Sequence, residues 1–427
     1  MVLDRKLVIV GGGVAGLTAA LSAREKNAEA KITILSKETY PPYSRPYLPY
    51  VIRETLSCPE EIAICSPQFL EDKKIRLLRG LEVYSIDNRK RMIKARELNT
   101  SKIRHFDYHA LILATGGQDI VPQIKGTELN NVFTFRTFDD ALKISQKVKL
   151  NKSAIVVGAG PIALSVAEAL VKRGVKTKIV IRSRALRTLI EPDLSRDLQR
   201  RIKEAGVEAL TSAEIEEIGG SRSVEYVKIF DKKIPASMLI FATGVRPSIE
   251  LAKETETKLG EYGIKVDEHL RTSNPEIYAA GDCIEATDSI TKKHTYFPIG
   301  SVAAEAGRIA GVNAVGGDER SDGFLRVQGD RLFGVDVTSI GHSSATANDI
   351  GIKANVIDIK LASLMRNSYC FGEKYRVKAK IVTDEKERII GAQTLGERFA
   401  AHDRYVLFRA IKEKMGLYEF LDFSTKV

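Results

Sequence analysis

Cysteine is scarce in this chain, with four residues among 427: Cys58, Cys65, Cys283 and Cys370. No two of them form a C-x-x-C pair, and no group of cysteine and histidine has the spacing of a metal site. We therefore expect no metal ion. We interpret the four cysteines as small buried hydrophobic residues.

Long apolar runs are also missing. None reaches the roughly 20 residues that a membrane-spanning helix needs. The first residues, MVLDRKLVIVGGG, lead almost directly into an expected strand and lack the successive charged, apolar and small-residue regions of a signal peptide. We therefore expect no membrane span and a cytoplasmic protein.

No basic stripe interleaved with aromatic residues is present, so no nucleic acid is expected as a partner. The chain has 66 Lys and Arg residues against 55 Asp and Glu residues, and its formal net charge is +11. Because the two signs are mixed along the chain, we favour a solvated surface of mixed charge. The alternative is a surface that attracts a small acidic electron carrier.

What the sequence does contain is a glycine-rich phrase near its start, LVIVGGGVAGLTAALSA. A short apolar run predicts a buried strand, Gly11, Gly13 and Gly16 form G-x-G-x-x-G, and the following residues predict a helix. The glycines allow a tight turn and let backbone N–H groups approach a pyrophosphate at the positive end of the helix. The strand KITIL completes the unit. We predict a dinucleotide site that includes Val14 and Ala15.

The same phrase returns at AIVVGAGPIALSVAEAL, followed by the expected strand TKIVIR. Its first two glycines lie 147 residues beyond those of the first copy. Two isoleucine pairs show the same offset: Ile32 with Ile179, and Ile34 with Ile181. The chain therefore holds two similar nucleotide-binding units. The second predicted site comprises Gly158, Gly160, Pro161, Ile162 and Ala163.

The two copies differ at the end of the second strand, where such units choose their ligand. An acid there usually holds ribose hydroxyls. The first copy has Ser36 and, two places on, Glu38, which we interpret as the ribose ligand. The second copy has no acid there but Arg182, Arg184 and Arg187, a cluster that suits a 2′-phosphate. We favour NADP(H) there over NAD(H), and a solvated basic turn is the alternative.

Four further segments follow in order: FDYHALILATGG, NVFTFRTFDDALKI, ASMLIFATGVRPSIELA and HLRTSNPEIYAAGDCIEATD. With the two glycine phrases, they make the chain resemble the pyridine nucleotide–disulfide oxidoreductases, especially the NADH oxidase and coenzyme A-disulfide reductase branch. The resemblance implies FAD in the first copy and the nicotinamide nucleotide in the second. It adds Thr115, Gly116, Gly281 and Asp282 to the FAD site and Gly244 to the NAD(P) site. Ser165 departs from many relatives, which carry Glu beside the nicotinamide.

The segment TYPPYSRPYLPYVI departs from that branch in another way. Pro46 and Tyr47 stand where coenzyme A-disulfide reductases carry a Cys-Gly pair, so the redox-active cysteine of the branch is absent. PYSRP instead resembles the cysteine-free rubredoxin and ferredoxin reductase components. Arg45 is expected to contact FAD phosphate or ring oxygens, and an exposed loop arginine is the alternative. Cys58 and Cys65 lie well downstream, and we do not assign them the missing role.

The last third of the chain resembles the interface domain through which the family dimerises. Residues 379–396 predict a hairpin and residues 398–416 a helix. Residues 294–317 predict the helix that precedes this domain. We expect a homodimer. His294 is a candidate acid or base, but we interpret it as structural and assign no catalytic residue.

These observations predict an α/β fold with two Rossmann-like dinucleotide-binding domains, for FAD and NAD(P), and a C-terminal α+β interface domain. The predicted FAD domain is split between residues 1–118 and 243–320, the NAD(P) domain spans 119–242 and the interface domain 321–427. We expect an FAD-dependent NAD(P)H oxidoreductase that passes electrons to O2 or a small acceptor. One alternative is the reductase component for an acidic electron carrier, and a second is a redox-responsive binding flavoprotein.

Overall fold

The computed structural model describes residues 5–149, 152–359, 377–396 and 401–426, without the side chains of 401–403, 421 and 423–426. Cys370 and the first residues of the predicted helix 398–416 lie outside the described residues. The chain forms two compact units. Unit 1 contains residues 1–45, 57–118 and 245–324, and unit 2 contains residues 46–56, 119–244 and 325–427. The four-part domain division stays a prediction.

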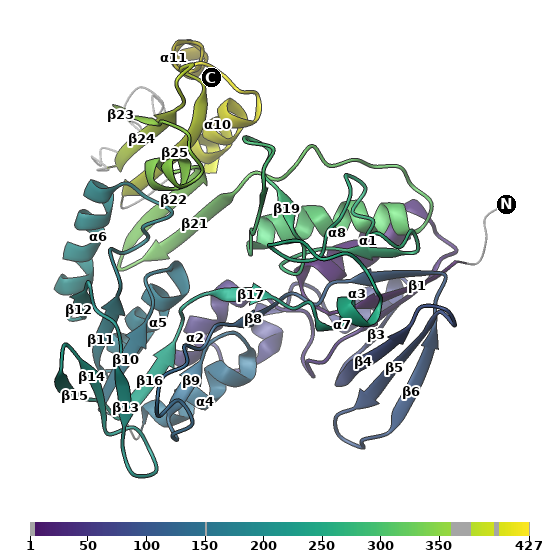
Figure 1. Cartoon of the computed structure of the whole chain (residues 1–427), viewed down its shortest axis with the longest axis horizontal. Helices are drawn as coiled ribbons and strands as arrows, with labels where there is room; N and C mark the ends of the chain where they lie inside the picture. Colours follow the sequence, from purple (N-terminus) through teal and green to yellow (C-terminus); the bar gives the residue numbers. More distant parts are fainter. Residues whose placement is uncertain (1–4, 150–151, 360–376, 397–400, 427) are drawn as a thin grey trace. The chain divides into compact units, whose positions relative to one another are not determined.

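Unit 1 is built on a five-stranded parallel sheet in the order β18-β7-β1-β2-β3 (Figure 1). Apart from Lys6 at the start of β1, the strands β1 and β7 are apolar and buried, as predicted for the LVIV run. The strands of this sheet are β1 (Lys6–Val10), β2 (Lys31–Leu35), β3 (Ile75–Leu78), β7 (Ala110–Leu113) and β18 (Ile277–Ala279).

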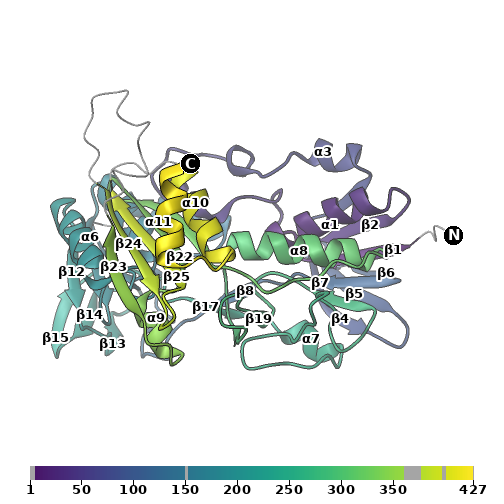
Figure 2. The same ribbon diagram turned by 90° about the horizontal axis from the view of Figure 1, so that it is seen from above.

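Two helices of unit 1, α1 (Val14–Lys26) and α8 (Gly300–Ala314), lie side by side (Figures 1 and 2). A Cβ atom added at Gly307 would lie 2.2 Å from the Ala15 carbonyl oxygen, and one at Gly311 2.1 Å from that of Ala19. Only glycine permits this approach of the two backbones. The other elements of unit 1 are α3 (Pro67–Asp72), the antiparallel sheet of β4 (Leu81–Asp87), β5 (Met92–Glu97) and β6 (Ile103–Asp107), α7 (Glu250–Glu254), and the pair β19 (Ala286–Thr287) and β20 (His294–Thr295).

Unit 2 contains a second parallel sheet, in the order β12-β11-β10-β16-β9, and two antiparallel sheets. The parallel sheet comprises β9 (Val132–Thr134), β10 (Ser153–Val157), β11 (Lys176–Ile181), β12 (Glu208–Thr211) and β16 (Met238–Phe241). The small antiparallel sheet comprises β13 (Glu217–Gly219), β14 (Tyr226–Ile229) and β15 (Lys232–Pro235). The helices of this region are α2 (Leu48–Ile52), α4 (Phe138–Val148), α5 (Pro161–Lys172) and α6 (Pro192–Glu204).

The C-terminal module of unit 2, residues 325–427, holds the second antiparallel sheet, in the order β21-β22-β25-β24-β23 (Figure 2). Its strands are β21 (Val327–Leu332), β22 (Val335–Gly341), β23 (Asn355–Ile359), β24 (Val377–Thr383) and β25 (Ile389–Gly396). The strands β24 and β25 form the predicted hairpin. Its helices are α9 (Ser344–Asp349), α10 (Ala401–Lys412) and α11 (Leu417–Lys426). The short strands β8 (Gly117–Asp119) and β17 (Val245–Pro247) pair in a two-stranded sheet.

Both parallel sheets match the predicted α/β class, which is confirmed. The isoleucine pairs that share an offset in sequence do not occupy equivalent positions in the two sheets. Ile32 aligns with Leu7, whereas Ile179 aligns with Val156, the counterpart of Ile9. The second unit thus joins its first two strands with two fewer residues. The matched isoleucines are not structurally equivalent, although a shift of two leaves them on the same face.

Two predicted helices are shorter than expected. The helix predicted over residues 294–317 begins at Gly300, and His294 lies exposed in β20. Pro298 explains the late start because a residue before proline is disfavoured in helical conformation. The helix predicted to end at Gly416 ends at Lys412. Lys414, with φ 57°, adopts a left-handed conformation that stops it.

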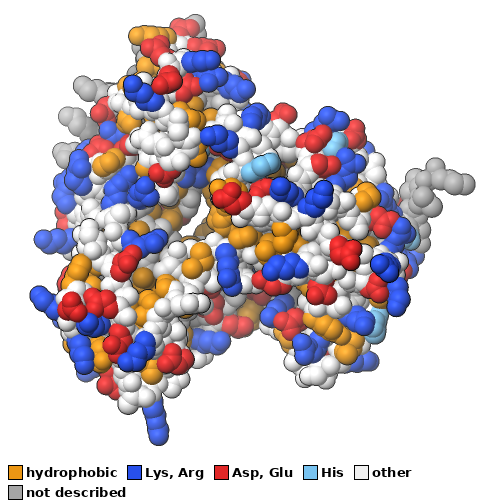
Figure 3. All heavy atoms as spheres, in the orientation of Figure 1, with side chains coloured by type: hydrophobic (Ala, Val, Ile, Leu, Met, Phe, Trp, Pro, Cys, Tyr) orange, Lys and Arg blue, Asp and Glu red, His pale blue; other side chains and the backbone are white. Residues whose placement is uncertain are grey.

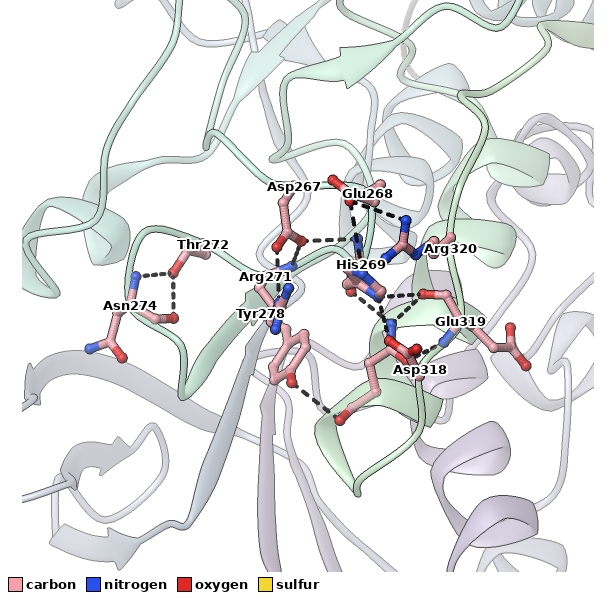
Figure 4. Close-up of polar contacts among 11 residues, drawn as sticks. Asp267, Glu268, His269, Arg271, Thr272, Asn274, Tyr278, Asp318, Glu319 and Arg320 are labelled. Carbon is pink, nitrogen blue, oxygen red and sulfur yellow. Dashed lines mark hydrogen bonds and ion pairs between the residues drawn. The ribbon is translucent and has the colours of Figure 1, made fainter.

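The C-terminal end of α8 is held by a polar cluster (Figure 4). The ring of His269, 5% exposed, lies 3.0 Å from the Glu319 carbonyl oxygen through Nδ1 and 3.3 Å from the Asp318 carboxylate. The buried Asn313 side chain donates to the carbonyl oxygens of His269 and Glu319 at 3.0 and 2.8 Å and accepts from the Glu319 N–H at 2.7 Å. Asn313 thus satisfies three backbone groups that have little access to water.

Replacing Asn313 by alanine is expected to lower the free energy of unfolding by about 2–3 kcal/mol, because buried backbone groups lose their partners. Thermal and urea unfolding of the flavin-free protein would measure the effect. Asn99→Ala, at an exposed position, is the control and should change stability little. Equal stability of the two variants would show that the cluster does not support unit 1.

Candidate functional site

The first glycine phrase forms a tight turn between β1 and α1. Gly11 has φ 120°, and a Cβ added there would lie 2.0 Å from the Ala114 carbonyl oxygen. A Cβ added at Gly16 would lie 2.0 Å from the Gly11 carbonyl oxygen. Both glycines are therefore required by the fold itself.

Gly13 differs from these two, because nothing in the protein requires it. It caps α1 with φ −77°, which any residue can adopt, and a Cβ added there would meet no protein atom within 4 Å. The first hydrogen bond of the helix runs from the Leu17 N–H to the Gly13 carbonyl at 2.9 Å, so the earlier N–H groups, including those of Val14 and Ala15, have no partner inside the helix. The open space at Gly13 lies where an anion would bind a helix N-terminus.

Segments far apart in the sequence meet at this turn. Gly281 has φ 85°, and a Cβ added there would lie 2.8 Å from the Ala15 Cβ. Gly281 precedes the half-buried Asp282. The hydroxyl of Thr115, next to Ala114, donates to the Ser248 carbonyl at 2.7 Å. The structure thus brings the predicted G-D and A-T-G segments to the start of α1.

Glu38 and Arg45 also belong to this group. A nitrogen of the Arg45 guanidinium lies 3.3 Å from the Glu38 carboxylate, which also accepts a hydrogen bond from the Tyr43 hydroxyl. Burial lowers the pKa of Arg45, but Glu38, Tyr43 and Asp282 outweigh it, and the net shift is upward. Arg45 therefore stays charged between two carboxylates. Its side chain keeps 38% exposure, and that of Glu38 keeps 31%.

The second glycine phrase repeats the geometry of the first. Gly158 has φ 142°, and a Cβ added there would lie 2.2 Å from the Ala242 carbonyl oxygen and 3.1 Å from the Cβ of Ala163. Gly160 caps α5 with φ −82°, and a Cβ added there would meet nothing within 4 Å. Pro161 opens the helix, and Ile162 is 39% exposed. Each copy therefore has one glycine that the fold does not need.

The arginine cluster lies in the loop that follows β11. The Leu186 N–H donates to the Ala159 carbonyl at 2.8 Å and ties this loop to the glycine turn. Arg182 is exposed. Arg187 pairs with Asp349 at 3.5 Å. Arg184 turns into its own loop, which makes it a structural residue.

Gly244 lies three residues beyond the end of β16, as Gly116 lies three residues beyond the end of β7. It has φ 117°, and its carbonyl accepts from the Ile120 N–H at 3.0 Å. The neighbouring Thr243 hydroxyl donates to the Ile120 carbonyl. The second A-T-G segment is thus bonded to the distant chain at Ile120, as the first one is bonded to Ser248 through Thr115.

None of the described thiols is activated as a nucleophile. Burial raises the pKa of Cys65 and of the fully buried Cys283. A backbone hydrogen bond involving Glu61 favours the Cys58 thiolate, but other groups outweigh it and the pKa of Cys58 is also raised. Cys58 and Cys65 are half-buried, so the expectation that they are buried is wrong for these two.

The close packing of α8 against α1 was not predicted from the sequence. Gly307 and Gly311, four residues apart, form a stripe of small residues against Ala15 and Ala19 and fix the start of α1. The four-residue spacing of these two glycines was the sequence signal from which the packing could have been predicted. Among the described residues, no three His, Cys, Asp or Glu side chains are placed to hold a metal ion. Every helix in the described ranges is too short or too polar to cross a bilayer.

Comparison with known proteins agrees with this geometry. The NADH oxidase of Methanocaldococcus jannaschii is 32% identical over 425 residues, which cover 97% of this chain and 94% of the relative. The NADH-rubredoxin oxidoreductase of Clostridium acetobutylicum is 29% identical over 340 residues, which cover 79% of this chain and 81% of the relative. The solved structure of an NAD-dependent persulfide reductase from A. fulgidus matches with a TM-score of 0.89 and 29% identity over 96% of this chain and 77% of that one. A profile of the pyridine nucleotide-disulphide oxidoreductase family matches residues 5–307, and the chain belongs to this family.

Proposed function

We propose that the chain is an FAD-dependent NADPH oxidoreductase of the oxidase type, with O2 or another small molecule as the final acceptor. The observation that carries the proposal is the pair of glycine turns, each with one glycine that the fold does not need. Gly13 and Gly160 leave room for a ligand at two helix N-termini. Relatives named NADH oxidase support the same reaction class.

The residues of unit 1 fit FAD. The N-terminus of α1, open at Gly13, would hold the pyrophosphate, and Glu38 would accept from the ribose hydroxyls. Asp282 and Arg45 offer an acceptor and a donor next to the same turn. When bound, FAD supplies the two-electron chemistry that accepts a hydride from the reduced nicotinamide, so the chain itself has to bind, orient and shield.

We assign NADPH rather than NADH to unit 2. The turn after β11 offers Arg182, exposed and with no acid at the ribose position, and Arg187 in the same loop. Guanidinium groups suit a 2′-phosphate, and a carboxylate there would repel it. Because these relatives are named for NADH, the nucleotide preference is the property in which we expect this chain to differ from them.

The proposed reaction uses none of the three described thiols, Cys58, Cys65 and Cys283, each of which has a raised pKa. The double variant Cys58→Ser, Cys65→Ser is therefore expected to oxidise NADPH within about twofold of the parent rate, the change typical of surface substitutions. Steady-state oxygen consumption would measure it. A loss of activity with retained flavin would assign one of the two thiols a role in turnover.

A second candidate function is the reduction of a small acidic electron-carrier protein. Relatives named NADH-rubredoxin oxidoreductase and rubredoxin-NAD(+) reductase favour it, together with the net charge of +11. On the face shown in Figure 3, however, Lys and Arg side chains are intermingled with Asp and Glu side chains. That mixture is weak support for steering of an acidic partner.

NADPH oxidation, measured with O2 alone and with an added rubredoxin-type carrier, tests both functions. Fast oxygen consumption that is insensitive to salt supports the oxidase. Turnover that needs the carrier and falls steeply with salt supports the second candidate. Slow turnover with a persistent charge-transfer band would overturn both and indicate a redox-responsive binding protein.

We also propose a homodimer formed through the C-terminal module. Tyr405 on α10 and Tyr418 on α11 are 58% and 74% exposed, which is unusual for large aromatic side chains. Light scattering after gel filtration would measure the mass. Tyr418→Asp should shift a dimer towards monomer, and a monomeric parent protein would contradict the proposal.

A further inference from the structure

The arginine loop, residues 182–191, joins β11 to α6 and contains the arginines of the proposed NADPH site. Its own contacts hold it only partly. Arg184 donates to the carbonyls of Ile190 and Arg187 at 2.6 and 3.0 Å, and the Ser195 hydroxyl donates to the Ala185 carbonyl at 2.7 Å. Burial and the nearby Arg187 lower the pKa of Arg184, although Glu191 opposes them.

Further contacts of the loop come from the C-terminal module, more than a hundred residues away in sequence. The Arg326 guanidinium donates to the Thr188 carbonyl at 2.9 Å, and the Ser343 hydroxyl donates to the same oxygen at 3.3 Å. The Ser339 hydroxyl, 2% exposed, donates to the Leu189 carbonyl at 2.7 Å. Two successive carbonyls of the loop, those of Thr188 and Leu189, are therefore held by residues of the C-terminal module.

A buried carboxylate completes the attachment. Glu191 is 3% exposed and caps α6. Its carboxylate accepts from Gln393 Nε2 at 2.9 Å, from the Ser344 N–H at 2.8 Å and from the Ser344 hydroxyl at 2.5 Å. Its own N–H donates to Gln393 Oε1 at 2.6 Å. We call Glu191, Gln393 and Ser344 the clasp.

Burial of the Glu191 carboxylate in the clasp costs free energy that packing alone would not require. A buried carboxylate loses its hydration and needs nearly all its hydrogen bonds restored, as they are here. The clasp fixes the end of the arginine loop. The loop begins with Arg182, and its middle is bonded to the glycine turn through Leu186. The geometry of the nucleotide site thus depends on residues of the C-terminal module.

We propose that the clasp is a specificity device, in which Gln393 and Ser344 hold the arginine loop in the conformation that binds a 2′-phosphorylated adenine nucleotide. Both are positioning residues, because they act on the ligand only through Glu191 and the loop. The inference rests on the proposed NADPH site. It predicts that discrimination between NADPH and NADH is lost when the clasp is broken, even though every arginine remains.

The test measures the affinity of the flavin-containing protein for 2′,5′-ADP and for 5′-AMP by isothermal titration calorimetry. Gln393→Leu leaves the buried carboxylate short of a donor, and we expect 2′,5′-ADP binding to weaken about tenfold. The 5′-AMP affinity should change less than about twofold, because the glycine turn is untouched. The limiting rate of flavin reduction at saturating NADPH should stay at the parent value.

Ser344→Ala is the milder variant, with an expected loss of about threefold for 2′,5′-ADP, and it decides the matter if Gln393→Leu does not fold. The matched control is Lys378→Gln. It breaks the 2.6 Å pair between Lys378 on β24 and Asp197 on α6, which links the same module to α6 without touching the loop. It should leave both affinities unchanged.

Arg182→Ala is measured in parallel to separate the two proposals. If it weakens 2′,5′-ADP binding but folded clasp variants do not, the clasp is overturned and the NADPH site stands. If neither Arg182→Ala nor the clasp variants change the preference, the NADPH assignment itself fails. A loss in both, with an unchanged Lys378→Gln control, supports the clasp.

Discussion

Gly13→Ala is expected to weaken FAD binding while leaving the flavin-free protein as stable as the parent. The apoprotein has room for the new methyl group, because a Cβ at this position meets no atom within 4 Å and φ is −77°. The bound pyrophosphate would collide with it. A clash of this kind costs about 1–3 kcal/mol, which corresponds to a loss of roughly 5- to 150-fold in affinity.

Calorimetric titration of the apoprotein with FAD and thermal unfolding without FAD would measure the two effects separately. Gly11→Ala is the contrasting variant. It should destabilise the apoprotein itself, because its Cβ would lie 2.0 Å from the Ala114 carbonyl oxygen at φ 120°. Tight FAD binding by Gly13→Ala would mean that no ligand approaches this helix N-terminus.

Arg182→Ala is expected to raise the KM for NADPH by about 10- to 100-fold and to leave that for NADH within about twofold. A charge-assisted hydrogen bond from arginine to phosphate contributes about 1.5–3 kcal/mol to binding. NADH has no 2′-phosphate, so its binding does not include this contact. Steady-state kinetics with both nucleotides would measure the change. The limiting rate with NADPH should stay close to that of the parent.

Arg196→Ala is the matched control for this prediction. It removes the same charge from an exposed position on α6. If both variants raise the KM for NADPH equally, the effect comes from net charge rather than from a contact. A parent protein that prefers NADH would refute the assignment directly.

Much of this architecture could be predicted because its signals are local. The LVIV and AIVV runs, the glycines after them and the helices that follow lie within single stretches of about 30 residues, the length of a βαβ unit. The fold requires glycine at Gly11 and Gly158, and the open space at Gly13 and Gly160 supports the proposed ligand sites. The family resemblance then connected the A-T-G and G-D segments, which local patterns alone cannot join.

The features that escaped prediction depend on contacts between distant segments. Nothing local indicates that residues 46–56 pack in unit 2, where Arg173 donates to the Ile52 carbonyl at 2.7 Å. The inward turn of Arg184 depends on the path of its loop. The clasp depends on Gln393, 202 residues beyond Glu191. The shift between the two isoleucine pairs escaped because a repeat in sequence does not fix strand register.

The close seam between α1 and α8 has a consequence for biosynthesis. The first nucleotide cradle needs Gly281 against Ala15 and then Gly307 and Gly311 against the same helix. A ribosome delivers those glycines only after all of residues 119–244 have emerged. We therefore expect flavin capture to be a late event in the life of the nascent chain, after the segment inserted into unit 1 has had time to begin folding.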